Sequence, residues 1–600
     1  MHLRDKVIWF VCVVLAVALF IAAGTQLDFI NAKREDMGLI LDKPENVPPS
    51  LAFATVATGA FRGLLVDVLW IRADNLKEQG QFFDAKQLAE LITILQPRFA
   101  TVWEFQAWNM AYNISVTIPA TRPDQRWQWV KNGYELLRDK GIEKNPRSIL
   151  LYRELARTFQ HKIGGISDDA HRYYKLQLAL AMEPLIGTED NRHFEALAEA
   201  PTDWAEIIKD ANVLSLIEAL KTADKTFTDD ESFVSKYLSL RRNPGRFKPA
   251  AFQVIDDFRG NKSLEKFDFF AKAYYLRNTW KLDPVLMREL NQTYGPVADW
   301  DDPNSRLPLD WRHPDSHAIY WAVKGLQMAG KGEYSPDETN TDRIVVHSLQ
   351  NLFRYGKIFV YDVPMPVRTE DAPQTSNGEQ LIMTQDIFMR PDLRMFDSYN
   401  QAMLAVLEKY KVLKETTYDA MRNGYRNMLK NAILSFYQAG SYDEDPHRRQ
   451  AKKIYDQLKQ NYPDIKDFED PLVVYVRKRL GEEIKTLGIF NAREIILMLL
   501  REAYFRYAVH DDNEAFAREK WAEEAFQIYK EKFEDVERVK LLEFPQMRYL
   551  ALRDFLNDWQ YPPNLRRNLL GRINIERPDL YKKLELEEEK LFKQKQQPQG

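Results

Sequence analysis

Helix-length runs of apolar residues recur in pairs along this chain, and each pair ends near a proline. Pro97, Pro146 and Pro184 mark the first three ends, at intervals of 49 and 38 residues. Intervals of this size are typical of helix–turn–helix repeats that stack on one another. The chain has only 24 glycines in 600 residues, which favours helices over turn-rich β architecture. We therefore expect an all-α chain whose paired helices stack into an α-solenoid.

The residues around these prolines resemble the tetratricopeptide family, in which Ala and Gly stand where two helices cross closely. The stretch GQFFDAKQLAELITILQP is similar to the second half of such a repeat, with Gly80 at the inter-helix turn, Ala85 at the crossing and Pro97 at the end. The next two helices match the family's bulky, small and aromatic positions at Trp103, Ala107, Tyr152, Leu155, Ala156 and Phe159. The resemblance implies helical repeats over residues 51–187.

A second group of repeat-like residues lies near the C-terminus. The residues that keep the family's spacing there are Gly440, Ala451, Tyr455 and Pro463. Residues 495–533 have the pattern of a further helix pair. We expect C-terminal repeats of the same type over residues 396–580, followed by a charged tail over 581–600.

The chain between these two groups is predicted to be helical over residues 188–353. Residues 354–395 differ, because the alternating runs KIFVYDVPMPV and QLIMTQDIFM flank a polar loop. Two such runs around a loop are typical of antiparallel strands. We therefore predict a small β-hairpin insertion in an otherwise helical chain.

The N-terminus carries one uninterrupted apolar run, Val7–Ala23. With its flanking residues it is long enough to cross ~30 Å of hydrocarbon as a helix. Arg4 and Lys6 precede it and should keep the N-terminus in the cytoplasm. We predict a single-pass transmembrane anchor within residues 1–27, a linker over 28–50, and a soluble body on the extracytoplasmic (periplasmic) side of the cell membrane. A cleaved signal peptide is the alternative, and it would place the body on the same side.

A second, less apolar stretch follows at Leu51–Ile71. Arg62 and Asp67 interrupt it, and a pair of charges is costly in the centre of a bilayer. This stretch therefore predicts a helix that is buried in the protein or lies on the membrane surface, rather than a second span.

Charge and cysteine content exclude several classes of function. The net charge of −4 indicates no basic surface of the kind that binds nucleic acid. The lone cysteine, Cys12, lies inside the apolar run. The body therefore has no disulfide, no thiolate metal site and no cysteine nucleophile.

The string DWRHPDSH, at residues 310–317, is the strongest candidate for chemistry. Two histidines beside an acid and a hydroxyl would suit a hydrolase or a metal site. Pro314, Asp315 and Ser316 are also typical of a helix N-terminus, where Asp315 would act as the cap. His317 would then lie in the first turn and face the core. We favour this structural interpretation.

Two further strings suggest ligands but lack essential residues. Gly325–Gly332 is similar to a phosphate-binding loop without its Ser or Thr, and it follows a helical pattern instead of a strand. Asp299, Asp301 and Asp302 are spaced unlike the ligands of a calcium-binding loop, so we expect a solvated turn there. We predict no catalytic residue, metal ligand or small-molecule cofactor.

The sequence therefore favours a non-enzymatic scaffold that binds a protein partner at the extracytoplasmic face of the membrane. Trp127 and Trp129 are two residues apart and cannot share one helix face, so at least one should be exposed. Together with Trp108 they are the predicted partner-binding residues. The chain also resembles bacterial membrane-anchored repeat proteins, which implies no specific function. The alternative is an envelope enzyme or sensor with its site in residues 298–400, near DWRHPDSH.

Overall fold

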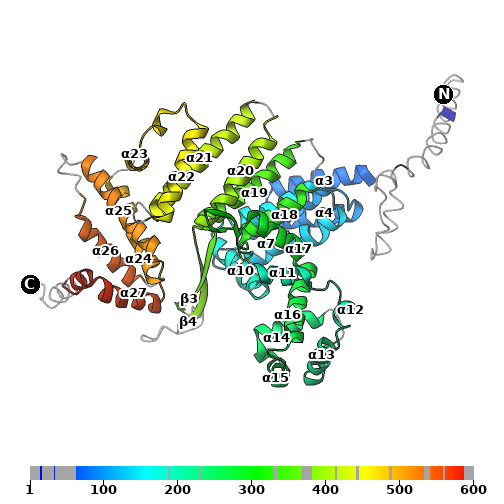
Figure 1. Ribbon diagram of the computed structural model, residues 1–600. Coiled ribbons are helices and arrows are strands. Elements are labelled where there is room, and N and C mark those ends of the chain that lie inside the picture. The colour runs from blue at the N-terminus through cyan, green and yellow to red at the C-terminus, as the bar shows by residue number, and fades with distance from the viewer. Residues whose placement is uncertain are drawn as a thin grey trace, which may run out of the picture. The chain divides into compact units, whose positions relative to one another are not determined.

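The computed structural model describes residues 14–15, 33, 62–186, 190–228, 232–328, 334–366, 381–412, 415–440, 445–485, 489–532, 541–558 and 561–586. The chain divides into two compact units, residues 1–96 and 97–600. Apart from two small two-stranded sheets, the described chain is all-α (Figure 1). Among the described residues, none of the helices is both long and apolar enough to span a bilayer. The predicted anchor at residues 7–23 lies outside the described residues, apart from Val14 and Leu15.

The first unit contains a helix pair, α3 (Arg62–Glu78) and α4 (Phe82–Leu95). Gly80 joins the two helices with a φ of 77°, a left-handed conformation that glycine adopts without strain. Ala85 is fully buried on α4, and α4 ends two residues before Pro97. These positions confirm the predicted turn, the buried small residue and the helix end.

The second unit begins with two further helix pairs. The elements of the first pair are α5 (Ala100–Trp108), η2 (Asn109–Ile114), α6 (Ser115–Thr117), α7 (Pro123–Glu135), η3 (Leu136–Gly141) and α8 (Ile142–Lys144). Those of the second are α9 (Ile149–Arg157), η4 (Thr158–Ile163) and α10 (His171–Ile186). Pro184 lies inside α10, so it does not end that helix, contrary to the sequence interpretation.

The first helices of these two pairs are copies of one another, offset by 49 residues. Each is an α-helix, α5 or α9, that continues into a π-helical segment, η2 or η4. The Trp103 indole N–H donates to the Pro97 carbonyl at 2.8 Å, and the Tyr152 hydroxyl donates to the Pro146 carbonyl at 3.1 Å. The 49-residue interval between the two prolines therefore corresponds to a structural repeat.

After α10 the chain leaves the repeat, and α12 to α16 form a group of helices with a core of its own (Figure 1). The elements of this region are α11 (Asn191–Glu199), α12 (Trp204–Ile207), α13 (Ala211–Ala223), α14 (Ser232–Arg242), η5 (Pro244–Arg246), α15 (Pro249–Asp257), α16 (Lys262–Tyr275), η6 (Leu276–Trp280) and α17 (Pro284–Tyr294). The core of α12 to α16 is built mainly from aromatic and aliphatic side chains between Ile207 and Ala271.

The chain then returns to the second repeat with α18 (Pro314–Leu326) and α19 (Pro336–Tyr355). His317 of α18 stacks on Phe159 with ring centroids 4.9 Å apart, and Trp321 of α18 stacks on Tyr152 of α9. The order of these contacts makes α18 antiparallel to the α9–η4 helix. Two of the helices that pack beside α9, α18 and α19, thus come from much later in the chain, which the sequence pattern does not indicate.

Two antiparallel hairpins interrupt the helices. The predicted insertion is confirmed as β3 (Lys357–Pro366) paired with β4 (Leu381–Arg390). Ile358 and Ile387 of this hairpin pack against Leu176 and Ala179 of α10. A shorter hairpin, β1 (Val297–Asp299) with β2 (Asp302–Arg306), was not expected as strands.

The rest of the chain returns to helices. Its elements are η7 (Leu393–Met395), α20 (Phe396–Lys409), α21 (Glu415–Ala439), α22 (Pro446–Asn461), η8 (Lys466–Phe468), α23 (Leu472–Lys485), α24 (Ile489–Ala508), α25 (Asp512–Lys532), α26 (Phe544–Asn557) and α27 (Pro563–Glu576). Ala451 and Tyr455 are buried on α22, which packs against α21, and α24 packs against α25. The helix pairs expected near the C-terminus are therefore present.

Candidate functional site

Three parallel helices lie side by side in the second unit: α5–η2, α9–η4 and α19. Tyr112 of η2 meets His161 of η4, with an Oη–Nδ1 distance of 3.3 Å. Gln160 of η4 donates to the Ser348 hydroxyl of α19 at 2.8 Å. The partly exposed side chains of these helices form a surface that we call the three-helix face. Its residues are Glu104, Trp108, Tyr112, Arg153, Arg157, His161 and Asp337.

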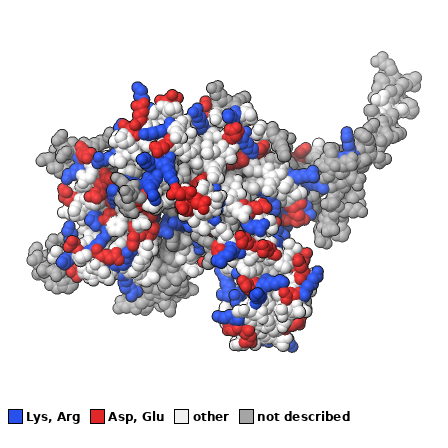
Figure 2. Space-filling view, in the orientation of Figure 1, with Lys and Arg blue, Asp and Glu red and all other residues white. Residues whose placement is uncertain are grey.

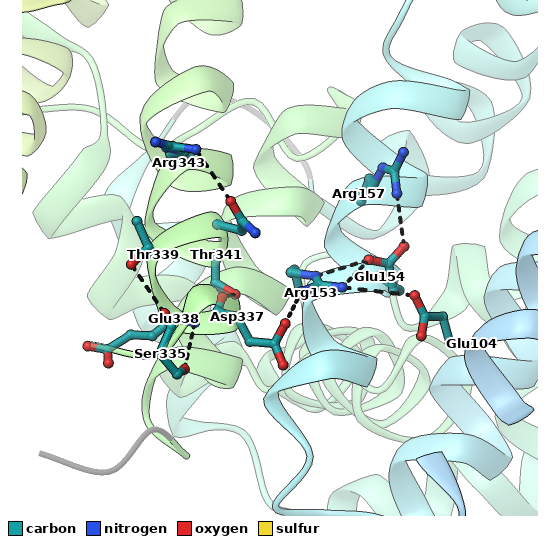
Figure 3. Close-up of polar contacts among 11 residues, drawn as sticks. Glu104, Arg153, Glu154, Arg157, Ser335, Asp337, Glu338, Thr339, Thr341 and Arg343 are labelled. Carbon is teal, nitrogen blue, oxygen red and sulfur yellow. Dashed lines mark hydrogen bonds and ion pairs between the residues drawn. The ribbon is translucent and has the colours of Figure 1, made fainter. Parts of the chain in front are cut away.

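Arg153 occupies the centre of the charged end of this face (Figure 3). It points from α9 between Glu104 of α5 and Asp337 of α19, and it forms an ion pair with Asp337. Its Nη2 atom lies 2.9 Å from Glu154 Oε1 and 3.9 Å from Glu104 Oε1. Arg157 adds a second contact to Glu154, with an N–O distance of 3.5 Å. Two arginines thus form ion pairs with three carboxylates, which lie on α5, α9 and α19.

Glu104 is the least compensated carboxylate of this group. Burial and the nearby negative charge of Glu154 together raise its pKa to about 7, against the opposing effect of Arg153. An additional cation near such a carboxyl would lower its pKa, because the cation stabilises the ionised form. Glu104 is therefore placed to accept a basic group from outside the chain.

The other end of the three-helix face is aromatic. Trp108 and Tyr112 stack with ring centroids 5.8 Å apart, and Tyr112 and His161 are also 5.8 Å apart. The Lys162 ammonium lies 5.2 Å from the centre of the Tyr112 ring. Trp108 and Tyr112 are half-buried and His161 is exposed, so the row offers ring surface to a partner.

Trp127 and Trp129 of α7 do not belong to this face. Trp127 stacks on Tyr174 of α10 with ring centroids 5.7 Å apart and packs against the main core. Both tryptophans are half-buried, so the expectation that one of them is exposed is wrong. Of the three predicted partner-binding residues, only Trp108 lies on the three-helix face.

A buried ionic network supports the aromatic row from below. Asp168 accepts from Arg126 at 3.0 Å, from Lys162 at 2.6 Å and from the Tyr174 hydroxyl at 3.2 Å. Burial alone would raise the pKa of Asp168, but the hydrogen bonds from Lys162 and the backbone of Ala170 lower it below its usual value. Lys162 is thereby held beneath the Tyr112 ring by an ionised partner.

The DWRHPDSH string forms the N-terminus of α18, as expected, but its cap is different. The Asp315 N–H donates to His313 Nδ1 at 3.1 Å, so His313 is the capping residue and the assignment of Asp315 as the cap is wrong. Pro314 is the first residue of α18, so the cap position belongs to the residue before it, His313. His317 lies in the first turn and faces the core, as predicted.

The geometry of this string does not fit nucleophilic catalysis. The Ser316 hydroxyl donates to the Asp310 carbonyl at 2.7 Å, and His317 Nε2 donates to the Trp311 carbonyl at 2.9 Å. The hydroxyl is therefore not activated by a histidine. All of these side chains except Asp310 and Arg312 are fully buried, which leaves a substrate no access.

Asp315 is the most perturbed acid of the string. Burial raises its pKa to about 7, although Asn351 donates to its Oδ1 atom at 3.0 Å. Its Oδ2 atom has no hydrogen-bond partner. Burial also lowers the pKa of the neighbouring Lys175 to about 8. These groups form a polar centre inside the stack of α10, α18 and α19.

The remaining candidate ligand sites lack ligand geometry. The described residues contain no group of three or more His, Cys, Asp or Glu side chains arranged to hold a metal. The predicted solvated turn is confirmed, because Asp301 lies in the turn between β1 and β2 and is exposed, as are Asp299 and Asp302 on either side of it. Gly325 lies within α18, and residues 329–332 of the phosphate-loop-like string lie outside the described residues.

Charges of both signs alternate over the side of the molecule drawn in Figure 2. Among the coloured residues of that view, neither sign forms a broad continuous surface. Specific recognition on this side would therefore depend on local groupings of charge, not on a long-range field.

Sequence reasoning found Trp108 but missed the charged residues beside it. Glu104, Trp108 and Tyr112 are the repeat equivalents of Arg153, Arg157 and His161, at the same 49-residue offset. Comparing the two repeats position by position could have found this face, except for the contribution of α19. Neither a family model nor a curated protein matches this chain.

Proposed function

We propose that this chain is a membrane-anchored helical-repeat scaffold whose three-helix face binds a protein partner outside the cytoplasm. The observation that supports it is the combination of half-buried aromatic rings and the under-compensated Glu104 carboxylate on one row of parallel helices. Tryptophan, tyrosine and arginine are the residues that contribute most to protein–protein affinity. A specific interface needs ~800 Å² from each partner, and three adjacent helices can supply that area.

The charges of this face favour a partner segment that carries a lysine or arginine beside an apolar or aromatic residue. A cation that reaches Glu104 would relieve the burial penalty on its carboxylate. From there it is one helical turn to Trp108, whose ring can accept an apolar side chain or stack on a guanidinium. Anchoring through residues 7–23 would restrict the search for this partner to the membrane surface.

The test is affinity capture with the full chain as bait, followed by comparison of two double variants. Trp108→Ala with Glu104→Ala removes a half-buried ring and a half-buried carboxylate of the three-helix face. Leu214→Ala with Glu218→Ala removes an exposed apolar and an exposed acidic group from α13, which belongs to a different core.

We expect an envelope protein captured by the wild type to be reduced about tenfold or more by the first variant, the loss produced by ~1.4 kcal/mol. The α13 variant should retain it. Equal retention by both variants would contradict the proposed face. Capture of nothing above an empty control would contradict the scaffold itself. We do not propose the alternative envelope enzyme or sensor, because the DWRHPDSH string is buried and lacks an activated nucleophile.

A further inference from the structure

The helix α3 is apolar on two opposite faces over its first three turns. Val66 and Ala73 are buried on the side that packs against α4. On the other side, Leu64, Val68 and Ile71 are 67%, 57% and 61% exposed. These three positions follow the i, i+4, i+7 spacing that places side chains in one stripe along a helix. We call them the α3 stripe.

The α3 stripe does not continue to the end of the helix. Asn75 and Glu78 occupy the same side one and two turns later, and both are exposed. The apolar surface is therefore confined to the end of α3 that is nearer in the chain to the apolar run at residues 7–23. Three large aliphatic side chains in water are costly, which indicates that something covers them in the cell.

We infer that the α3 stripe lies on the lipid surface of the membrane that holds the anchor. Residues 24–61 connect the apolar run to α3, so an anchor in the bilayer would tether the helix to that membrane and raise its effective concentration at the lipid surface. The sequence left open whether this helix is buried or lies on the membrane, and the exposed stripe favours the membrane. This inference rests on the proposed anchoring through residues 7–23 and adds a second, peripheral contact with lipid.

The charges beside the stripe indicate which property of the lipid matters. Asp67 and Arg72 are exposed on opposite flanks of the stripe. Their charges cancel, so α3 has no excess of basic groups to attract anionic headgroups, as many surface helices have. The contact should therefore be driven by burial of the apolar side chains at the boundary between headgroups and acyl chains, and should not change with the anionic lipid content.

The test uses the full chain in vesicles, with nitroxide probes along α3. Cys12, the only cysteine, is first replaced by Cys12→Ser. Single cysteines are then introduced as Leu64→Cys, Val68→Cys and Ile71→Cys in the stripe, with Asn75→Cys and Asp67→Cys as matched controls on the same helix. Each protein is labelled and reconstituted into vesicles of phosphatidylcholine, alone or mixed with phosphatidylglycerol.

Collision of each probe with oxygen, which concentrates in lipid, is compared with collision with a water-soluble nickel chelate. We expect the oxygen-to-nickel ratio at the three stripe positions to be severalfold higher than at the two controls, in both vesicle types. A ratio at the stripe equal to that at Asn75→Cys would overturn the inference. Low accessibility of the stripe to both reagents would overturn it too, because it would mean that protein covers these residues.

Flotation of the same samples separates the inference from the proposed anchoring. If the protein floats with the vesicles but the stripe remains aqueous, the anchor is supported and the lipid contact of α3 is wrong. If the protein does not float, both the anchor and the lipid contact are wrong.

Discussion

Burial shifts the pKa values of neighbouring residues in DWRHPDSH in opposite directions. It lowers the pKa of His313 to about 3 and that of His317 to about 4, and it raises that of Asp315 to about 7. In each case the uncharged form is favoured, because the core solvates charge poorly. The histidines stabilise the fold above their unfolded pKa and lose this contribution as the pH falls. Asp315 stabilises the fold below its unfolded pKa and loses its contribution as the pH rises toward 7.

Replacing Asp315 by Asn isolates the contribution of the acid. An amide keeps the shape of the protonated carboxyl and can still accept from Asn351. Between about pH 5 and pH 7, the stability of Asp315→Asn relative to wild type should rise by up to about 1.4 kcal/mol per pH unit, then level off. Native-state hydrogen exchange of the amides of α18 measures this difference. Parallel pH profiles for the two proteins would show that Asp315 is ionised in the fold.

The close approach of elements in this protein depends on a few small residues. A Cβ atom at Gly325 would lie 2.7 Å from the Cβ of Tyr152, where α18 crosses α9. A Cβ atom at Gly133 of α7 would lie 2.8 Å from the Ala107 carbonyl oxygen. Neither glycine has a special backbone conformation, so both are required by helix packing. The family resemblance indicates small residues where the two helices of one pair cross, as Gly133 of α7 and Ala107 of α5 do. It does not indicate one at Gly325, where α18 crosses a helix from much earlier in the chain.

Gly325→Ala should therefore destabilise the protein, although Ala is the better helix former. The cost of separating α18 from α9 is ~1–3 kcal/mol, which exceeds the ~1 kcal/mol gained in helix propensity. Gly571→Ala is the matched control, because a Cβ atom there meets nothing within 4 Å on α27. Calorimetry should show a lower melting temperature for the first variant and an unchanged or higher one for the second. If both variants melted higher than wild type, α18 would not cross α9 so closely.

At the scale of the whole molecule, the chain combines a repeated part with inserted parts. The 49-residue repeat spans α5–η2 and α9–η4, and α12 to α16 form a separate core before α18 and α19 rejoin the stack. A further core, built from residues 492–580, serves α24 to α27. An anchor at one end would present all of these cores to a single compartment.

The predicted topology can be tested on intact cells. Basic residues before the apolar run should hold the N-terminus in the cytoplasm and place residues 28–600 outside it. Protease added to spheroplasts should therefore degrade the body and leave a short membrane fragment that contains residues 7–23. A cytoplasmic marker protein must stay intact as the control. If the body resisted protease until the membrane was broken, residues 28–600 would lie in the cytoplasm and the predicted topology would be wrong.

Local features of this fold could be predicted from the sequence. Gly80, Pro97 and Pro314 mark helix ends correctly, because glycine and proline act on the backbone where they stand. The hairpin of β3 and β4 follows from alternation along two runs. Burial of Ala85 and Ala156 follows from their place in the helical pattern. In the candidate site only Trp108 could be predicted, because the adjacent charges belong to helices whose pairing the pattern leaves undetermined.

The sequence by itself determined the helices, their pairing with the next helix in the chain and the 49-residue interval, since these depend on contacts a few residues or one turn away. Only the tertiary structure decided that α18 and α19 lie beside α9, because the helices of residues 191–294 separate them in the chain. That same packing buries DWRHPDSH and brings Asp337 to Arg153. The free energy of such distant contacts is shared among many side chains, so no short pattern of residues specifies it.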